Sequence, residues 1–131
     1  MSYRVNYDSK LDPPAPVLDI SFGNPKDTSK TIDVKCVLVD SGADLVTIPE
    51  WIADQLKLMP TGWANSYGFD GTFSGKQPVY SVIISFDKFS YIERAVQTPG
   101  EPLIGRNILN KFNTNLRGPL KRMEVTKWQK L

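Results

Sequence analysis

Short apolar stretches rich in β-branched residues recur along the chain, and residues typical of turns separate them. The first stretch spans residues 17–22, and residues 23–27 have the composition of a turn. The second stretch, residues 31–39, predicts the strongest strand of the chain. Its alternation places four side chains on one face, where we expect them to be buried: Ile32, Val34, Cys36 and Leu38.

The remaining pattern predicts more short strands and two small helices. Further strands or apolar stretches are expected in residues 45–48, 63–85 (two strands), 91–96, 103–105 and 121–126. One helix is expected from Pro49 to about Leu58, because proline is favoured in the first helical turn, and another over residues 106–112. Many short strands with closely spaced turns and little helix predict a mostly-β domain, barrel-like or sandwich-like.

Residues 1–16 differ from the rest of the chain. They are polar and end in Pro13, Pro14 and Pro16, which excludes a central strand, so we expect an N-terminal arm. Residues 17–131 are expected to form a single domain, because 131 residues is the usual length of one domain.

The composition excludes several kinds of catalytic and metal-binding site. The chain contains 16 Lys or Arg and 14 Asp or Glu, a net charge of +2, which is too small to indicate a nucleic-acid or membrane partner by itself, and we expect no nucleic-acid partner. It contains no histidine, which excludes Ser-His-Asp and Cys-His catalysis and zinc sites built on imidazole. The single cysteine, Cys36, excludes an intrachain disulfide and a cysteine metal cluster. We therefore expect no metal and no cofactor.

The sequence shows neither an apolar leader nor an apolar stretch long enough to cross a bilayer. A cytoplasmic protein without membrane attachment is expected.

The sharpest chemical feature is Asp40-Ser41-Gly42, which follows the strand predicted over residues 31–39. A carboxylate near an apolar interior is costly unless it is paired or hydrogen-bonded. The Gly42 amide can point at the Asp40 carboxylate, and the Ser41 hydroxyl can donate and accept, so the three residues can cradle one reactive carboxylate. The alternative is an ordinary strand-to-turn junction, since Asp, Ser and Gly are common turn residues.

A second motif later in the chain, with a hairpin between the two, makes the functional interpretation of Asp40-Ser41-Gly42 more specific. Residues 37–44 (Val-Leu-Val-Asp-Ser-Gly-Ala-Asp) resemble the catalytic signature of the retropepsin-like aspartic proteases. Residues 103–109 (Leu-Ile-Gly-Arg-Asn-Ile-Leu) resemble the second signature of that family, whose retroviral members share the Gly-Arg-Asn core. A glycine-bearing hairpin near residues 68–75 falls where the family keeps its flap. The resemblance covers roughly residues 17–117.

The resemblance implies a closed, barrel-like acid-protease fold in a two-fold symmetric homodimer. It implies an aspartic endopeptidase that hydrolyses extended polypeptides, a class of chemistry that needs two carboxylates on one water. The chain has one Asp-Ser-Gly, so each subunit would supply one Asp40. The alternatives are a catalytically silent dimerisation or peptide-binding module with the same fold, and a protease that acts chiefly on its own precursor.

The resemblance also assigns supporting roles to other residues. Ser41 would hydrogen-bond across the dimer axis, the Gly42 carbonyl would face bound peptide, and Ala43 and Asp44 would line the substrate groove. Asp44 would form a partly buried ion pair with Arg106, whose alternative role is that of a surface residue at a helix start. The second motif contributes Leu103, Ile104, Gly105 and Asn107, and the flap contributes Tyr67, Gly68, Phe69, Asp70 and Gly71.

Overall fold

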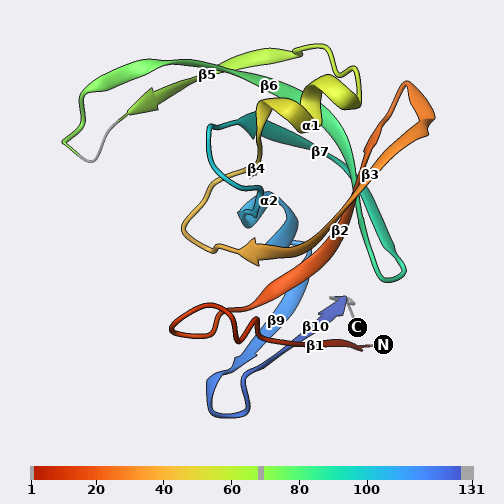
Figure 1. Ribbon diagram of the computed structural model, residues 1–131, viewed down its shortest axis with the longest axis vertical. Helices are drawn as coiled ribbons and strands as arrows, with labels where there is room; N and C mark the ends of the chain where they lie inside the picture. The colour runs from red at the N-terminus through yellow and green to blue at the C-terminus, as the bar shows by residue number, and fades with distance from the viewer. Residues whose placement is uncertain (1, 68–69, 128–131) are drawn as a thin grey trace.

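The structure is a computed structural model that describes residues 2–67 and 70–127. Its strands form two sheets (Figure 1). The seven-stranded sheet has the order β2-β3-β8-β4-β7-β6-β5, and β2 also pairs with β6, so the sheet curves around the core. Its strands are β2 (Val17–Asn24), β3 (Asp27–Val39), β4 (Val46–Ile48), β5 (Gly62–Tyr67), β6 (Phe73–Phe86), β7 (Phe89–Gln97) and β8 (Leu103–Ile104).

The second sheet has three strands in the order β1-β10-β9: β1 (Ser2–Asn6), β10 (Arg122–Lys127) and β9 (Phe112–Arg117). The helices of the described chain are α1 (Glu50–Gln55), α2 (Arg106–Leu109) and the 3-10 turn η1 (Gly118–Leu120). The prediction of a mostly-β protein with two short helices is confirmed. Within the described ranges, no helix is long and apolar enough to cross a bilayer.

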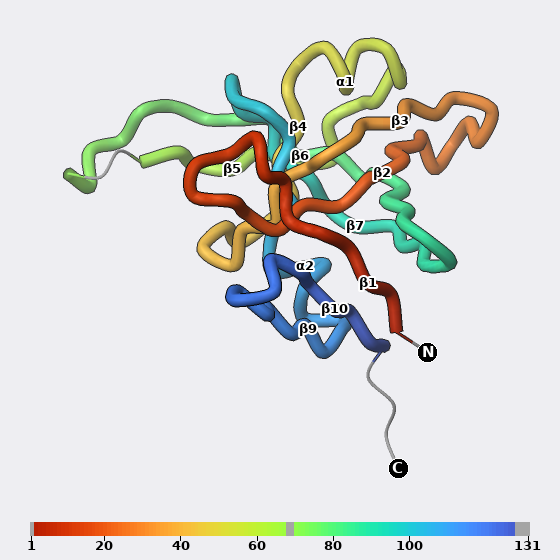
Figure 2. Tube along the Cα trace, turned by 60° about the horizontal axis from the view of Figure 1, so that its bottom comes forward, coloured from red at the N-terminus to blue at the C-terminus, as the bar shows by residue number. Residues whose placement is uncertain are grey.

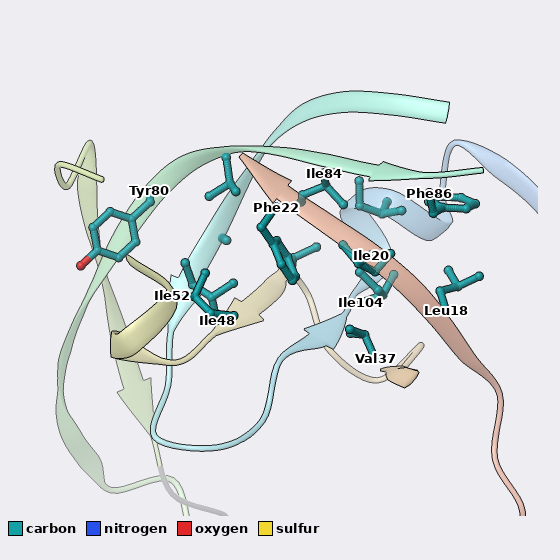
Figure 3. Packing of buried hydrophobic residues seen from close by; sticks show 14 of the residues in the cluster. Leu18, Ile20, Phe22, Val37, Ile48, Ile52, Tyr80, Ile84, Phe86 and Ile104 are labelled. Atoms are coloured by element: carbon teal, nitrogen blue, oxygen red, sulfur yellow. The ribbon is translucent and has the colours of Figure 1, made fainter. Parts of the chain in front are cut away.

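One hydrophobic core fills the curve of the larger sheet. Figure 3 shows Ile52 of α1 beside Ile48 of β4, with Phe22 of β2 close by. The side chains labelled in that view are buried and come from strands and a helix that lie far apart in sequence: Leu18, Ile20, Phe22, Val37, Ile48, Ile52, Tyr80, Ile84, Phe86 and Ile104. Because burial of apolar surface drives folding, this cluster fixes the end of β3 beside β8. The loop that carries Asp40 begins at that end of β3.

The prediction that Cys36 is buried is wrong, and a β-bulge is the reason. Between the pairs Leu18↔Val37 and Ile20↔Val34, β3 advances by one residue more than β2. Cys36 has a left-handed φ of 57° and is exposed, and its amide donates to the Asp19 carboxylate at 2.9 Å. The extra residue shifts the alternation by one position, so Val37 enters the core in place of Cys36.

Both helices are shorter than predicted. After α1, the chain turns at Lys57, which has a φ of 55°, and the Asn24 side-chain amide donates to the Leu56 carbonyl at 2.9 Å. After α2, Phe112 begins β9, where its ring packs against Phe89 and Tyr91 at centroid distances of 4.9 and 5.8 Å. These tertiary contacts end the two helices earlier than local propensity would.

The segment expected to form an N-terminal arm contributes a strand to the smaller sheet. Strand β1 pairs antiparallel with β10, and Tyr3 and Val5 pack against the core. Strand β9 was not predicted either, because Asn113 and Asn115 have low strand propensity, and it forms through pairing with β10. In Figure 1 this sheet lies at the opposite end of the molecule from α1.

Candidate active site

The loop that carries Asp40 emerges where two parallel strands end. β3 and β8 pair through Leu38↔Leu103 and Val39↔Ile104. The Asp40 amide donates to the Ile104 carbonyl at 2.9 Å, which continues the ladder by one more bond. The two sequence motifs, far apart along the chain, therefore lie side by side.

The Asp40 carboxylate is held by its own loop. It is half-buried, and its Oδ1 accepts a hydrogen bond from the Gly42 amide at 2.8 Å. A side chain at position 42 would place its Cβ 3.1 Å from that oxygen, so glycine leaves the carboxylate room. Among the hydrogen bonds of the described residues, the Gly42 amide is the one donor to this carboxylate. Ser41 and Gly42 are exposed beside it.

The second motif packs directly against the backbone of the Asp40 loop. The Arg106 amide donates to the Ala43 carbonyl at 2.9 Å, and the Asn107 amide donates to the Asp44 carbonyl at 3.3 Å. Gly105 is buried at this contact, and a Cβ there would lie 2.4 Å from the Leu45 carbonyl oxygen. Only glycine permits so close an approach of the two backbones.

The Asn107 side chain connects three segments. Its Oδ1 accepts from the Val46 amide of β4 at 3.0 Å, and its Nδ2 donates to the Arg94 carbonyl of β7 at 2.8 Å. One amide side chain of α2 therefore fixes where β4 and β7 lie relative to the Asp40 loop.

The structure brings Asp44 and Arg106 together, as the resemblance implies. The Arg106 guanidinium pairs with the Asp44 carboxylate and also donates to the Ser41 carbonyl at 2.9 Å. The pair is exposed rather than partly buried: the two side chains retain 45% and 84% of their accessible surface. Because water screens it, the pair contributes less than about 1 kcal/mol to folding, and it positions the loop by its geometry.

The hairpin of β5 and β6 projects from the body of the protein (Figures 1 and 2). Tyr67 ends β5 opposite Phe73, and the two rings meet edge to face at 5.9 Å. Gly71 has a left-handed φ of 81° at the tip, which favours glycine. Two residues expected in the flap, Gly68 and Phe69, lie outside the described residues.

Asp70 closes the turn at the hairpin tip. Its Oδ1 accepts from the Thr72 hydroxyl at 2.6 Å and from the Thr72 amide at 3.0 Å. The hydroxyl contact is the larger cause, and together they lower the pKa of the Asp70 carboxyl below its ordinary value.

A groove of about 480 Å³ lies between this hairpin and the Asp40 loop. The loop and β4 contribute one wall, the hairpin strands contribute the other, and the end of β7 completes it: Ala43, Asp44, Leu45, Thr47, Ala64, Asn65, Ser66, Tyr67, Gln77, Val96 and Thr98. The sequence motifs pointed to Ala43, Asp44 and Tyr67 but missed the others. Thr47 carried a usable signal, because it alternates with the apolar residues Val46 and Ile48.

Chemically, the arrangement offers a half-buried carboxylate on the loop whose following residues form one wall of the groove, with a hairpin opposite that could cover a bound chain. Within the described ranges, no group of three or more carboxylate, cysteine or histidine side chains is placed to hold a metal ion.

No protein-family model and no curated protein sequence matches the chain. Solved structures do match it. A retropepsin-like aspartic protease from Rickettsia conorii superimposes with a TM-score of 0.62 and 14% identity, over 95% of this chain and 90% of that chain. The EIAV protease, solved with the inhibitor HBY-793, superimposes with a TM-score of 0.50 and 21% identity, over 81% of this chain and 92% of that chain.

A foamy viral protease-reverse transcriptase, solved in complex with double-stranded DNA, superimposes with a TM-score of 0.51 and 18% identity. The match covers 76% of this chain and 16% of that much longer one. At these identities the comparisons bear on the fold alone. The chain has a retropepsin-like fold.

Proposed function

We propose that this protein is an aspartic endopeptidase that hydrolyses extended polypeptides with a water activated by two Asp40 side chains, one from each subunit of a homodimer. The observation that carries the proposal is the placement of Asp40. Its carboxylate stands at the open end of β3, oriented by the Gly42 amide and half-exposed beside a groove, within a retropepsin-like fold.

A second copy is needed because one carboxylate cannot do both tasks. One carboxylate must be ionised to take a proton from water while another, protonated, hydrogen-bonds the scissile carbonyl. The nearest candidate in sequence, Asp44, is already paired with Arg106. The second Asp40 would therefore come from an identical chain across a two-fold axis.

The surface beside Ser41 suits such a contact. An apolar hollow next to Ser41 is lined by residues that include Val39, Leu109 and Leu116. Leu116 lies opposite Met123 and so faces the core side of the smaller sheet, yet it is 55% exposed. Strand β9 is one edge of that sheet, and among the described strands it pairs on one side only, which leaves a row of backbone groups that a second copy could pair with.

In the proposed reaction the ionised Asp40 removes a proton from the water, whose oxygen attacks the carbonyl carbon. The protonated Asp40 of the other subunit gives its proton to the carbonyl oxygen, which produces a tetrahedral diol. Collapse of the diol breaks the C–N bond as the Asp40 that took the water proton gives it to the leaving nitrogen, while the other Asp40, now ionised, takes a proton from a diol hydroxyl and so returns to its starting state. Burial beneath the β5–β6 hairpin would exclude bulk water from these steps.

The test is peptide cleavage from acidic to neutral pH by the full chain and by the Asp40→Asn variant. The proposal expects cleavage by the wild type and a loss of at least about a thousandfold in the variant. Equal activity of the two proteins would refute it. Tight binding of a tetrahedral-intermediate mimic, compared with a plain peptide of the same sequence, would separate a protease from a silent peptide-binding module.

A further inference from the structure

The outward face of the three-stranded sheet consists of polar side chains. Tyr3, Val5, Met123 and Val125 of this sheet pack against the core, so alternation along the strands turns their neighbours outward. The strand register aligns these neighbours in three rows: Ser2↔Thr126↔Asn113, Arg4↔Glu124↔Asn115 and Asn6↔Arg122↔Arg117. Within the strands as described, this face therefore carries charged, amide and hydroxyl groups and no apolar side chain.

Three arginines on this face gather around one glutamate. Their guanidinium groups lie 3.6, 3.3 and 3.5 Å from the same oxygen, Glu124 Oε1, in the order Arg4, Arg117 and Arg122. Arg117 and Arg122 also lie directly opposite each other on neighbouring strands, where like charges repel. One carboxylate balances one of three guanidinium charges, so the cluster keeps a net charge of +2 and favours a second anion.

The arginine cluster is open to solvent on its outward side. The Arg4 and Arg117 side chains retain 64% and 45% of their accessible surface, whereas Glu124 retains 19%. Each guanidinium has five N–H donors, far more in total than one carboxylate can accept. An anion can therefore bind the exposed arginines without displacing Glu124.

The positive charge of the protein is concentrated on this sheet. Residues 2–6 and 112–127 carry five Lys or Arg and one Glu, a net charge of +4. The rest of the chain carries 11 Lys or Arg and 13 Asp or Glu, a net charge of −2. The total of +2 therefore hides a basic end of the molecule, and the expectation of no nucleic-acid partner, which rests on that total, is revised here.

We propose that the outward face of this sheet binds the phosphate backbone of a double-stranded nucleic acid. Guanidinium forks bind phosphate bidentately, and amide side chains such as those of Asn6 and Asn115 also contact phosphate oxygens. Interfaces with nucleic acids are polar and positively charged, whereas a protein partner usually buries apolar or aromatic anchors, which the described face lacks. Without an aromatic side chain, this face also offers no platform on which single-stranded bases could stack. Such binding goes beyond the proposed function and does not depend on it.

The test measures, by fluorescence anisotropy, how the full chain binds a labelled DNA duplex of about 20 base pairs between about 50 and 200 mM salt. Three arginines that contact phosphate predict a slope of about −3 when the logarithm of the association constant is plotted against that of the salt concentration. Arg4→Gln/Arg117→Gln removes the two more exposed charges and leaves Arg122 paired with Glu124. This variant is expected to bind at least about tenfold more weakly at the lowest salt and to lose about two units of slope.

Lys26→Gln/Lys57→Gln is the matched control. It also removes two exposed positive charges, but both residues line a hollow just after α1, at the opposite end of the molecule (Figure 1). Its affinity is expected to stay within about twofold of the wild type, with an unchanged slope.

Glu124→Gln should have the opposite effect to the arginine variant. It removes the carboxylate that competes with phosphate for the three arginines, so the duplex is expected to bind at least about threefold more tightly. Unchanged or weaker binding by Glu124→Gln would mean that the ion cluster serves only to hold the sheet together, and would overturn the proposal.

Other outcomes would also overturn it. These are no binding at about 50 mM salt, or equal losses in the two double variants. A polyglutamate peptide that binds as tightly as the duplex, and weakens equally in Arg4→Gln/Arg117→Gln, would assign the face to an acidic protein. Tighter binding of single-stranded DNA would assign it to bases. Asp40→Asn should bind the duplex as the wild type does, so a failure of the proteolytic function leaves this result unaffected.

Discussion

At the residue scale, Gly105 is the glycine at which an added side chain would be least tolerated. Replacement by alanine would place a Cβ 2.4 Å from the Leu45 carbonyl oxygen and 2.9 Å from the Ala43 carbonyl oxygen. Both neighbours are backbone atoms of the Asp40 loop, so they cannot move aside as a flexible side chain would. We expect Gly105→Ala to lower the free energy of unfolding by about 2–3 kcal/mol, measured by urea denaturation.

Gly62→Ala is the control for this prediction. A Cβ at Gly62 would meet no atom within 4 Å, and the residue lies in β5 without a left-handed φ. The change in its unfolding free energy is expected to stay within about 1 kcal/mol. Equal effects of the two substitutions would mean that the loop does not pack tightly against the second motif.

Site residues that lie within the two short motifs could be located from the sequence. Asp40, Gly42 and the contact between Asp44 and Arg106 could be placed because each lies within or between two short motifs. Cys36 could not, because a bulge depends on how two strands pair.

At the element scale, Asn107 joins β4, β7 and α2 through one side chain. Asn107→Leu keeps the volume but leaves the Val46 amide and the Arg94 carbonyl without this partner. We expect a loss of about 2–4 kcal/mol of unfolding free energy and faster hydrogen exchange at the Val46 amide. Asn110→Leu, at an exposed position just after α2, should change neither quantity. Unaltered exchange at Val46 in Asn107→Leu would contradict this role.

The turn at the tip of the hairpin is expected to respond to acid. Because the Thr72 contacts lower the pKa of Asp70 in the folded protein, the ionised carboxylate stabilises the turn above the ordinary aspartate pKa. This stabilisation is lost as the pH falls below about 4 and Asp70 becomes protonated. Carboxyl chemical shifts followed by NMR should show Asp70 titrating below the usual range, and Thr72→Val should raise its pKa.

Asp27 provides an internal reference for that titration. Its pKa is lowered in the same way, chiefly by the Ser29 hydroxyl, which donates at 2.6 Å. Thr72→Val should leave the Asp27 titration unchanged. If Asp70 titrated identically with and without the Thr72 hydroxyl, the turn would not depend on this contact.

Element types were more predictable than element lengths. Alternation identified β2, β3, β6 and β7, because a half-buried strand repeats every second residue. The ends of α1 and α2 could not be predicted, since the Asn24 side chain and the Phe112 ring come from distant segments. Strand β9 was missed because its asparagines disfavour a strand, and only its pairing with β10 compensates.

At the scale of the whole molecule, the proposed homodimer would explain why apolar surface and a strand edge are exposed near Asp40. Ser41 and Leu116 line one hollow beside Asp40, and strand β9 next to them has a free edge. A second copy would cover these groups and bring the second Asp40. Sedimentation of the wild type should then show a dimer, and Leu116→Lys should shift it toward monomer by at least about tenfold in dissociation constant.

The most direct test of the central claim mixes wild-type protein with Asp40→Asn at constant total concentration, after time for subunit exchange. If each site needs one Asp40 from each of two chains, mixed dimers are inactive, and an equal mixture retains about one quarter of the wild-type cleavage rate. A catalyst contained in one chain would retain about one half. A rate that falls in direct proportion to the wild-type fraction would contradict a shared active site.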